Sequence, residues 1–183
     1  MAVGAIGSIQ GALGIVVTRK KPSHFVALTE DGRIDAVLNQ GGKLADVLEK
    51  RSAISIKDAQ QGPNDGSALS AANLKTLDPY DVTVAMPAAD GEPAVTDADR
   101  DAWSRFRVSY EVVLEATPFR IMGTLLLLPS QDPSSLMERG TELFLPVLNP
   151  TVQLNGLAIK DVPRDSVLVN RSHIRRVSSA HQR

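Results

Sequence analysis

The sequence predicts a mainly β fold, β-barrel or sandwich-like, with a few short helices. Two observations support this prediction. Short runs rich in Val, Ile and Leu, several of them alternating with polar residues, recur along the chain, which is typical of β-strands. Residues that favour turns, chiefly Gly, Pro, Asn and Asp, separate these runs at short intervals, and only brief segments show the apolar spacing of a helix.

The N-terminal β unit is assigned to residues 1–60. Its predicted strands are 14–19, 24–29, 33–38 and 53–57. The turn sequence Glu30-Asp31-Gly32 joins the second and third of these strands into a hairpin. Segment 43–51 places three apolar residues at i, i+3 and i+4, which predicts one face of a short helix.

Residues 61–101 are interpreted as an acidic linker rich in Pro and Gly. Between positions 76 and 101 the chain has seven acidic residues and one basic residue. Such a composition buries little apolar surface, so it favours a loop or linker. One strand, 81–86, interrupts the linker and is assigned to the first unit.

The C-terminal β unit, 102–183, contains the clearest strand pattern. Residues 107–116 alternate between apolar and polar, and 119–128 can pair with them as a hairpin. Gly123 in the second arm predicts a bulge or a close backbone approach. The other predicted elements are a helix within 96–107 with Trp103 and Phe106 facing inward, a helix at 133–139, strands at 142–148, 165–169 and 174–177, and a hairpin at 153–160.

The two halves run in the same order, which suggests a duplicated small β unit. Each half shows a strand, a turn, a strand, a short helix, a strand and a later strand. Segment 43–60 corresponds to 132–152 in order and hydrophobic phase, and 82–87 is matched with 167–172. The alternative is one mixed domain whose halves share one sheet.

The order of strand, hairpin, short helix and strand is loosely similar to Sm-like and oligonucleotide-binding barrels. A diagnostic motif of either family is absent from the sequence. The chain is therefore assigned to no family.

Composition excludes several classes of function. The 183 residues include 20 Lys and Arg against 21 Asp and Glu, so the net charge of −1 excludes a chain that is polycationic throughout. The absence of Cys excludes a disulfide scaffold, a thiolate metal site and a cysteine nucleophile. Aromatic residues make up 4% of the chain, too few to favour a surface that stacks bases or sugars.

No motif marks a catalytic residue, a cofactor site or a metal site, so we expect the protein not to be an enzyme. The three histidines are dispersed, are interpreted as solvated, and accompany no nucleophile elbow. Asp97-x-Asp99-x-Asp101 matches the start of a calcium loop, but Ala102 and Val108 stand where the loop needs Gly and Glu. The N-terminal glycines match no phosphate-binding loop.

The uncharged segment 1–17 is followed directly by Arg19, Lys20 and Lys21. A membrane span needs about 20 predominantly apolar residues, and this segment is shorter and rich in Gly. A secretory signal has its basic residues before the apolar run rather than after it. We therefore expect a cytoplasmic protein without a membrane span, in which this segment leads into the first strand.

Charge is segregated along the chain, and this segregation directs the functional prediction. Segment 160–183 has six basic and two acidic residues, opposite in sign to 76–101. The leading hypothesis is a non-catalytic binding or assembly module that contacts protein subunits, its own copies or others, through β edges and charged segments. In such an oligomer the acidic segment of one subunit would meet the basic tail of another.

The alternative hypothesis is a protein that binds nucleic acid or another anionic ligand. Its candidate contact residues are Lys20, Lys21, Arg171, Arg175 and Arg176. A simpler interpretation of the basic tail is a solvated edge strand whose charges discourage aggregation. An enzyme without a recognisable motif is the third hypothesis.

Overall fold

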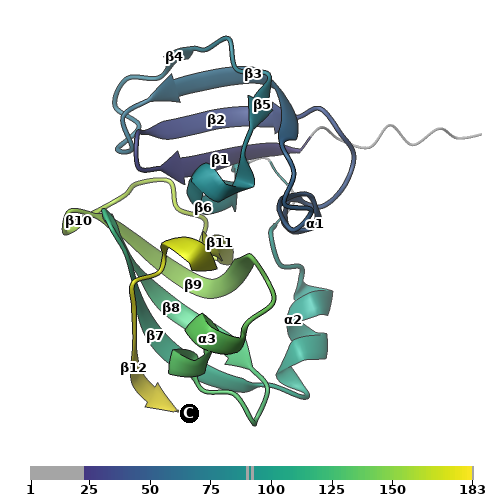
Figure 1. Ribbon diagram of the computed structural model, residues 1–183, viewed down its shortest axis with the longest axis vertical. Coiled ribbons are helices and arrows are strands. Elements are labelled where there is room, and N and C mark those ends of the chain that lie inside the picture. Colours follow the sequence, from purple (N-terminus) through teal and green to yellow (C-terminus); the bar gives the residue numbers. More distant parts are fainter. Residues whose placement is uncertain (1–22, 90, 92, 183) are drawn as a thin grey trace, which may run out of the picture.

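The computed structural model describes residues 23–89, 91 and 93–182, which form a mainly β structure as the sequence predicts (Figure 1). The strands are β1 (His24–Thr29), β2 (Arg33–Leu38), β3 (Ile54–Gly62), β4 (Ser70–Ala71), β5 (Thr76–Leu77), β6 (Val82–Pro87), β7 (Val108–Ala116), β8 (Phe119–Leu127), β9 (Phe144–Leu154), β10 (Leu157–Ala158), β11 (Ser166–Asn170) and β12 (Arg176–Gln182). The helices are α1 (Leu44–Leu48), α2 (Asp97–Ser104) and α3 (Leu136–Arg139), and the 3-10 turns are η1 (Pro79–Asp81), η2 (Pro133–Ser135) and η3 (Arg171–His173). The predicted strand 14–19 lies outside the described residues.

One antiparallel sheet runs through both halves of the chain. Its strand order is β12-β7-β8-β9-β11-β6-β1-β2-β3-β4, with β10 paired to β9 and β5 paired to β3. The sheet is not closed, because β12 and β4 stand at its two ends. In Figure 1 the first half, purple to teal, lies above the second half, green to yellow.

Strand β6 joins the two halves. It pairs with β1 of the first half, where Val84 lies opposite Leu28, and with β11 of the second half, where Ala85 lies opposite Leu168. All six residues of β6 are buried, although the surrounding segment 61–101 is interpreted from its composition as a linker. The same segment also contains β4, β5, η1 and the start of α2.

Two hydrophobic cores lie on opposite faces of the central strands. Phe25 and Ala27 of β1 belong to a core that includes α1, whereas Val26 and Leu28 belong to a core formed mainly by the second half. Because successive side chains of a strand point to opposite faces, a strand between two cores is apolar at almost every position. The sequences of β1 and β6 therefore read as continuous apolar runs.

The two halves repeat one pattern of strand pairing. In the first half β6 pairs with β1, β1 with β2, β2 with β3 and β3 with β5. In the second half β12 pairs with β7, β7 with β8, β8 with β9 and β9 with β11. In each half a 3-10 turn, η1 or η3, connects the last strand of this series back to the first. We call residues at matching places in these two registers counterparts.

These pairings match β6 with β12, whereas the sequence order matched segment 82–87 with 167–172. In the first half, Leu28 of β1 lies between Val84 of β6 and Arg33 of β2. In the second half, Glu115 of β7 lies between Arg176 of β12 and Arg120 of β8. Val84 and Arg176 are therefore counterparts. Local spacing could not separate the two alignments, because both β11 and β12 are short strands near the C-terminal end of the described chain.

Gly123 lies where the backbones of β8 and β9 approach closely, as its position in the predicted hairpin suggested. A Cβ atom there would stand 2.6 Å from the carbonyl oxygen of Leu148 and 2.6 Å from Cγ1 of Val147. The β8–β9 register also shifts between Met122 and Thr124. Glycine is needed here because no side chain fits.

Within the described residues, no helix combines the length and the apolar character that crossing a membrane requires.

Candidate interaction surfaces

Asn170 is the polar centre of the junction between the halves. Its side chain is fully buried, and its Nδ2 donates to the carbonyl oxygens of Pro79 at 3.1 Å and Val82 at 2.9 Å. Its Oδ1 accepts from the backbone N–H of Ser172 at 3.0 Å and so caps η3. One amide therefore orders the turn after β11 and holds it against the start of β6.

His173 makes a second polar contact across this junction. Its Nε2 lies 2.7 Å from the carbonyl oxygen of Tyr80, and its Nδ1 lies 3.1 Å from Oγ1 of Thr83. A carbonyl oxygen only accepts, so Nε2 carries a proton. The prediction that the histidines are solvated is wrong for His173, because both of its ring nitrogens have protein partners. His24 is half-buried, and the side chain of His181 lies outside the described part.

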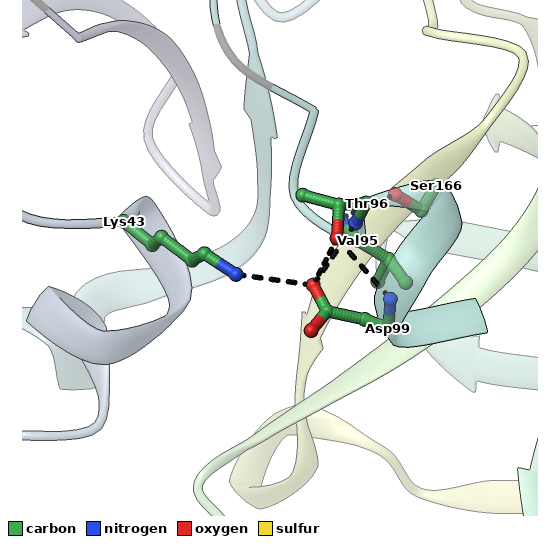
Figure 2. Close-up of polar contacts among 5 residues, drawn as sticks. All are labelled: Lys43, Val95, Thr96, Asp99 and Ser166. Atoms are coloured by element: carbon green, nitrogen blue, oxygen red, sulfur yellow. Dashed lines mark hydrogen bonds and ion pairs between the residues drawn. The ribbon is translucent and has the colours of Figure 1, made fainter. Parts of the chain in front are cut away.

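The start of α2 is tied to both halves (Figure 2). Asp99 Oδ2 lies 3.1 Å from Nζ of Lys43, which precedes α1, and Asp99 and Thr96 form a reciprocal capping box. The backbone N–H of Val95 donates to Oγ of Ser166 on β11 at 3.2 Å. Hydrogen bonds from the Thr96 hydroxyl, from Lys43 and from the Thr96 amide lower the pKa of Asp99. Asp99, one of the acids of segment 76–101, thus has a structural partner in the first half.

A cleft of about 310 Å³ opens between the end of α2, the end of β8 and the start of β9. Trp103 lines it, and the guanidinium of Arg107 lies 4.9 Å from the centre of the Trp103 ring. Phe106, predicted to face inward, is 74% exposed, so that prediction is wrong. The α2 helix ends two residues earlier, and Phe106 no longer follows the helical spacing that would have turned it inward.

An acidic cleft of about 420 Å³ lies beside β5 and η1. Its lining includes four acidic residues, Glu30, Asp31, Asp78 and Asp81, together with His173. Among residues 23–89, 91 and 93–182, no three His, Asp or Glu side chains are placed to hold a metal ion. The lining makes this cleft an acidic surface beside β5 and η1.

The structure keeps two of the five predicted anion-contact residues together as an exposed pair. Arg175 and Arg176 are neighbours in the chain and both are exposed, and NH1 of Arg176 lies 3.5 Å from Oε2 of Glu115. Arg171 is half-buried instead, and its NH1 lies 3.4 Å from the carbonyl oxygen of Leu136. Lys20 and Lys21 lie outside the described residues.

Strand β12 is an edge strand of the sheet, and the turn η2 lies beside it. It pairs with β7 on one side, and no other strand of the described part pairs with it on the other. Its counterpart β6 pairs on both sides. The sequence signal for this edge is weak, because the run Arg-Val-Ser-Ser has one apolar residue and no clear alternation.

Comparison with known proteins returned no matching family model, no matching curated protein and no matching solved structure.

Proposed function

We propose that this protein is a non-catalytic assembly module that binds another protein subunit by adding a strand to the free edge of β12. One observation carries the proposal: β6, the counterpart of β12, accepts a strand from the other half of the chain along the matching edge. A free edge presents unpaired N–H and C=O groups, which an extended segment of a partner can pair. The fold thus contains one example of the interaction that the proposal assigns to β12.

The charges beside this edge favour a selective partner. Arg175 and Arg176 are exposed at the start of β12. Positive charge on an edge strand disfavours unspecific pairing between like edges, and it favours a partner segment with acidic neighbours. We therefore expect association to weaken as salt concentration rises.

The half-buried histidine at the junction supports a structural rather than a catalytic role. Both ring nitrogens of His173 lie within hydrogen-bond distance of groups in the first half. A general base needs a nitrogen that is free to reach a substrate. In this arrangement the imidazole holds the two halves together.

A photo-reactive amino acid at Ser179 tests the proposal directly. Ser179 is exposed on β12, and Thr151, exposed on β9, is the matched control position. In the cells that produce the protein and in the purified protein, we expect cross-links from Ser179 to an extended segment of a protein subunit and few from Thr151. Mass spectrometry identifies the cross-linked peptide. Absence of cross-links from Ser179, or equal yields from both positions, would overturn the proposal.

Binding of an anionic ligand is the alternative that the same surface allows. Fluorescence anisotropy with short DNA and RNA at two salt concentrations tests it, because each phosphate contact contributes roughly one unit to the salt slope. If the double variant R175E/R176E loses nucleic-acid binding while Ser179 gives no cross-links, the alternative replaces the assembly proposal. If the protein does not bind nucleic acid, the alternative fails.

A further inference from the structure

We infer that the strand added to β12 is β5 of a second copy, so that copies join head to tail. This inference rests on the strand-addition function proposed above. Within the chain, β11 of the second half pairs with β6 of the first. The counterpart of β11 is β5, and the counterpart of β6 is β12. If the pairing of β11 with β6 is repeated between two copies, β5 of one copy pairs with β12 of the next.

The internal register predicts the register between copies. Inside the chain Val169 lies opposite Val84, and Leu168 lies opposite Ala85. The counterpart of Val169 is Leu77, and the counterpart of Val84 is Arg176. The same register between two copies therefore places Leu77 of one copy opposite Arg176 of the next. Thr76 then lies opposite Val177.

The side chains at this predicted junction carry complementary charges. Within the chain, His173 of η3 contacts Thr83 of β6 at 3.1 Å. The counterpart of His173 is Asp81, and the counterpart of Thr83 is Arg175. The pairing between copies therefore brings the carboxylate of Asp81 of one copy to the guanidinium of Arg175 of the next. Within the chain, the same place holds the neutral hydrogen bond between His173 and Thr83.

The surroundings of these two residues strengthen the match. Asp81 lies in the acidic cleft beside β5, and Arg175 lies next to the exposed Arg176. Opposite potentials steer two surfaces together and disfavour contacts between surfaces of like charge. Strands β5 and β12 stand at opposite ends of the repeated pairing pattern, as a head-to-tail contact requires.

The side chains of β7 and β12 beside the predicted contact indicate how strongly two copies bind each other. Val26, Leu28, Val84 and Met86 of the first half are buried in the core that the second half completes. Their counterparts on the second half are Val113, Glu115, Arg176 and Ser178, which are at least partly exposed. The contact between copies therefore buries less apolar surface than the junction inside the chain, and we expect it to be reversible and sensitive to salt.

The contact joins two different surfaces of the same chain. Such a heterologous contact produces a closed ring if the rotation between copies closes, and an open filament if it does not. Both outcomes keep the same pair of strands at every contact. Sedimentation velocity at low salt distinguishes them by whether the particle size reaches a limit as concentration rises.

Charge exchange between Asp81 and Arg175 tests the inference. At low salt we expect the unmodified protein to associate, and D81R alone and R175D alone to lose at least tenfold in association constant. An equimolar mixture of D81R and R175D should associate again, because every contact between the two different variants pairs opposite charges. R105D reverses an exposed charge at the end of α2, on neither β5 nor β12, and should associate like the unmodified protein. Thermal melting of each variant shows that it is folded.

Two further outcomes separate the inference from the proposed function. The chain has no Cys, so D81C and R175C each introduce a unique thiol. Under mild oxidation we expect a mixed disulfide dimer only when the two variants are combined. If Ser179 cross-links to another protein or to another part of a second copy, and the charge exchange has no effect, the inference fails while the strand-addition function stands. If Ser179 gives no cross-links, both fail.

Discussion

The side-chain amide of Asn170 donates to the carbonyl oxygen of Val82 at 2.9 Å, and this buried bond joins the last turn of the second half to the strand shared by both halves. The counterpart of Asn170 is Asp78, which caps η1 through one bond to the backbone N–H of Tyr80 at 2.9 Å and is exposed. The two residues have the same capping role, and only Asn170 also donates across the junction.

Replacing Asn170 should therefore destabilise the protein far more than replacing Asp78. N170A removes two buried hydrogen bonds across the junction, to the carbonyl oxygens of Pro79 and Val82, together with the cap of η3, and we expect a loss of about 3 kcal/mol in the free energy of unfolding. D78A removes an exposed cap and should cost about 1 kcal/mol. Urea unfolding followed by circular dichroism measures both values. Equal losses would show that the contacts across the junction contribute nothing beyond capping.

Replacing Arg33 should likewise destabilise the protein more than replacing its counterpart Arg120. Nε and NH2 of Arg33 lie 2.6 and 2.9 Å from the two carboxylate oxygens of Asp35, and this arginine is 9% exposed. Its hydrogen bond to Asp35 raises the pKa of Arg33, so the arginine stays charged throughout the accessible pH range. R33A leaves Asp35 without its partner and should cost about 3 kcal/mol. R120A removes an exposed side chain and should change stability by less than about 0.5 kcal/mol.

A methyl group at Gly123 should destabilise the second half. Its Cβ would meet the backbone oxygen of Leu148 at 2.6 Å, and backbone atoms yield less readily than a flexible side chain. We expect G123A to cost about 1–3 kcal/mol, as overpacked core sites do. The counterpart position holds Ala36, where A36G should cost about 1 kcal/mol through added backbone freedom. A G123A protein as stable as the unmodified chain would contradict the close approach.

Acidification should weaken the attachment of α2 through Asp99. The pKa of Asp99 is lowered in the folded chain, so its contribution to stability is present above the unfolded pKa of about 3.9 and is lost as pH falls through the lower folded value. We therefore expect D99N to lower the thermal midpoint at neutral pH and to reduce the fall of that midpoint below about pH 4. Melting curves from pH 7 to pH 3 test this, and an unchanged acid dependence would contradict it.

The partner of Asp99 provides a control for this result. If the contact between Asp99 and Lys43 contributes, the variants K43M and D99N should be less than additive in a double-mutant cycle. T96A removes the cap hydroxyl and should cost about 1 kcal/mol without removing either charge. Full additivity of K43M and D99N would assign the effect of Asp99 to the capping box alone.

Local patterns in the sequence predicted most of the individual elements. The predicted strands 24–29 and 33–38 match β1 and β2, because the turn between them and the apolar residues within them are all local signals. The predicted strands 107–116 and 119–128 match β7 and β8 within one residue at each end. A hairpin pairs neighbours in the chain, so its register follows from its turn.

The central place of β6 within segment 61–101 could not be predicted from local sequence patterns. Val82–Pro87 is surrounded by acidic residues, Pro and Gly, and its composition alone indicates a strand inside a linker. Its central place depends on β11, which follows it by about 80 residues in the chain. Pairing at such a separation depends on how both cores close, which no short window of sequence contains.

The sequence by itself determined the mainly β class, the order of the elements and the segregation of charge, because each of these depends on neighbouring residues. Only the tertiary structure decided that the halves share β6, that Asn170 and His173 are junction residues rather than part of a solvated tail, and that β12 corresponds to β6. The physical reason is burial: whether a polar side chain is solvated or must find a partner depends on which distant strand covers it.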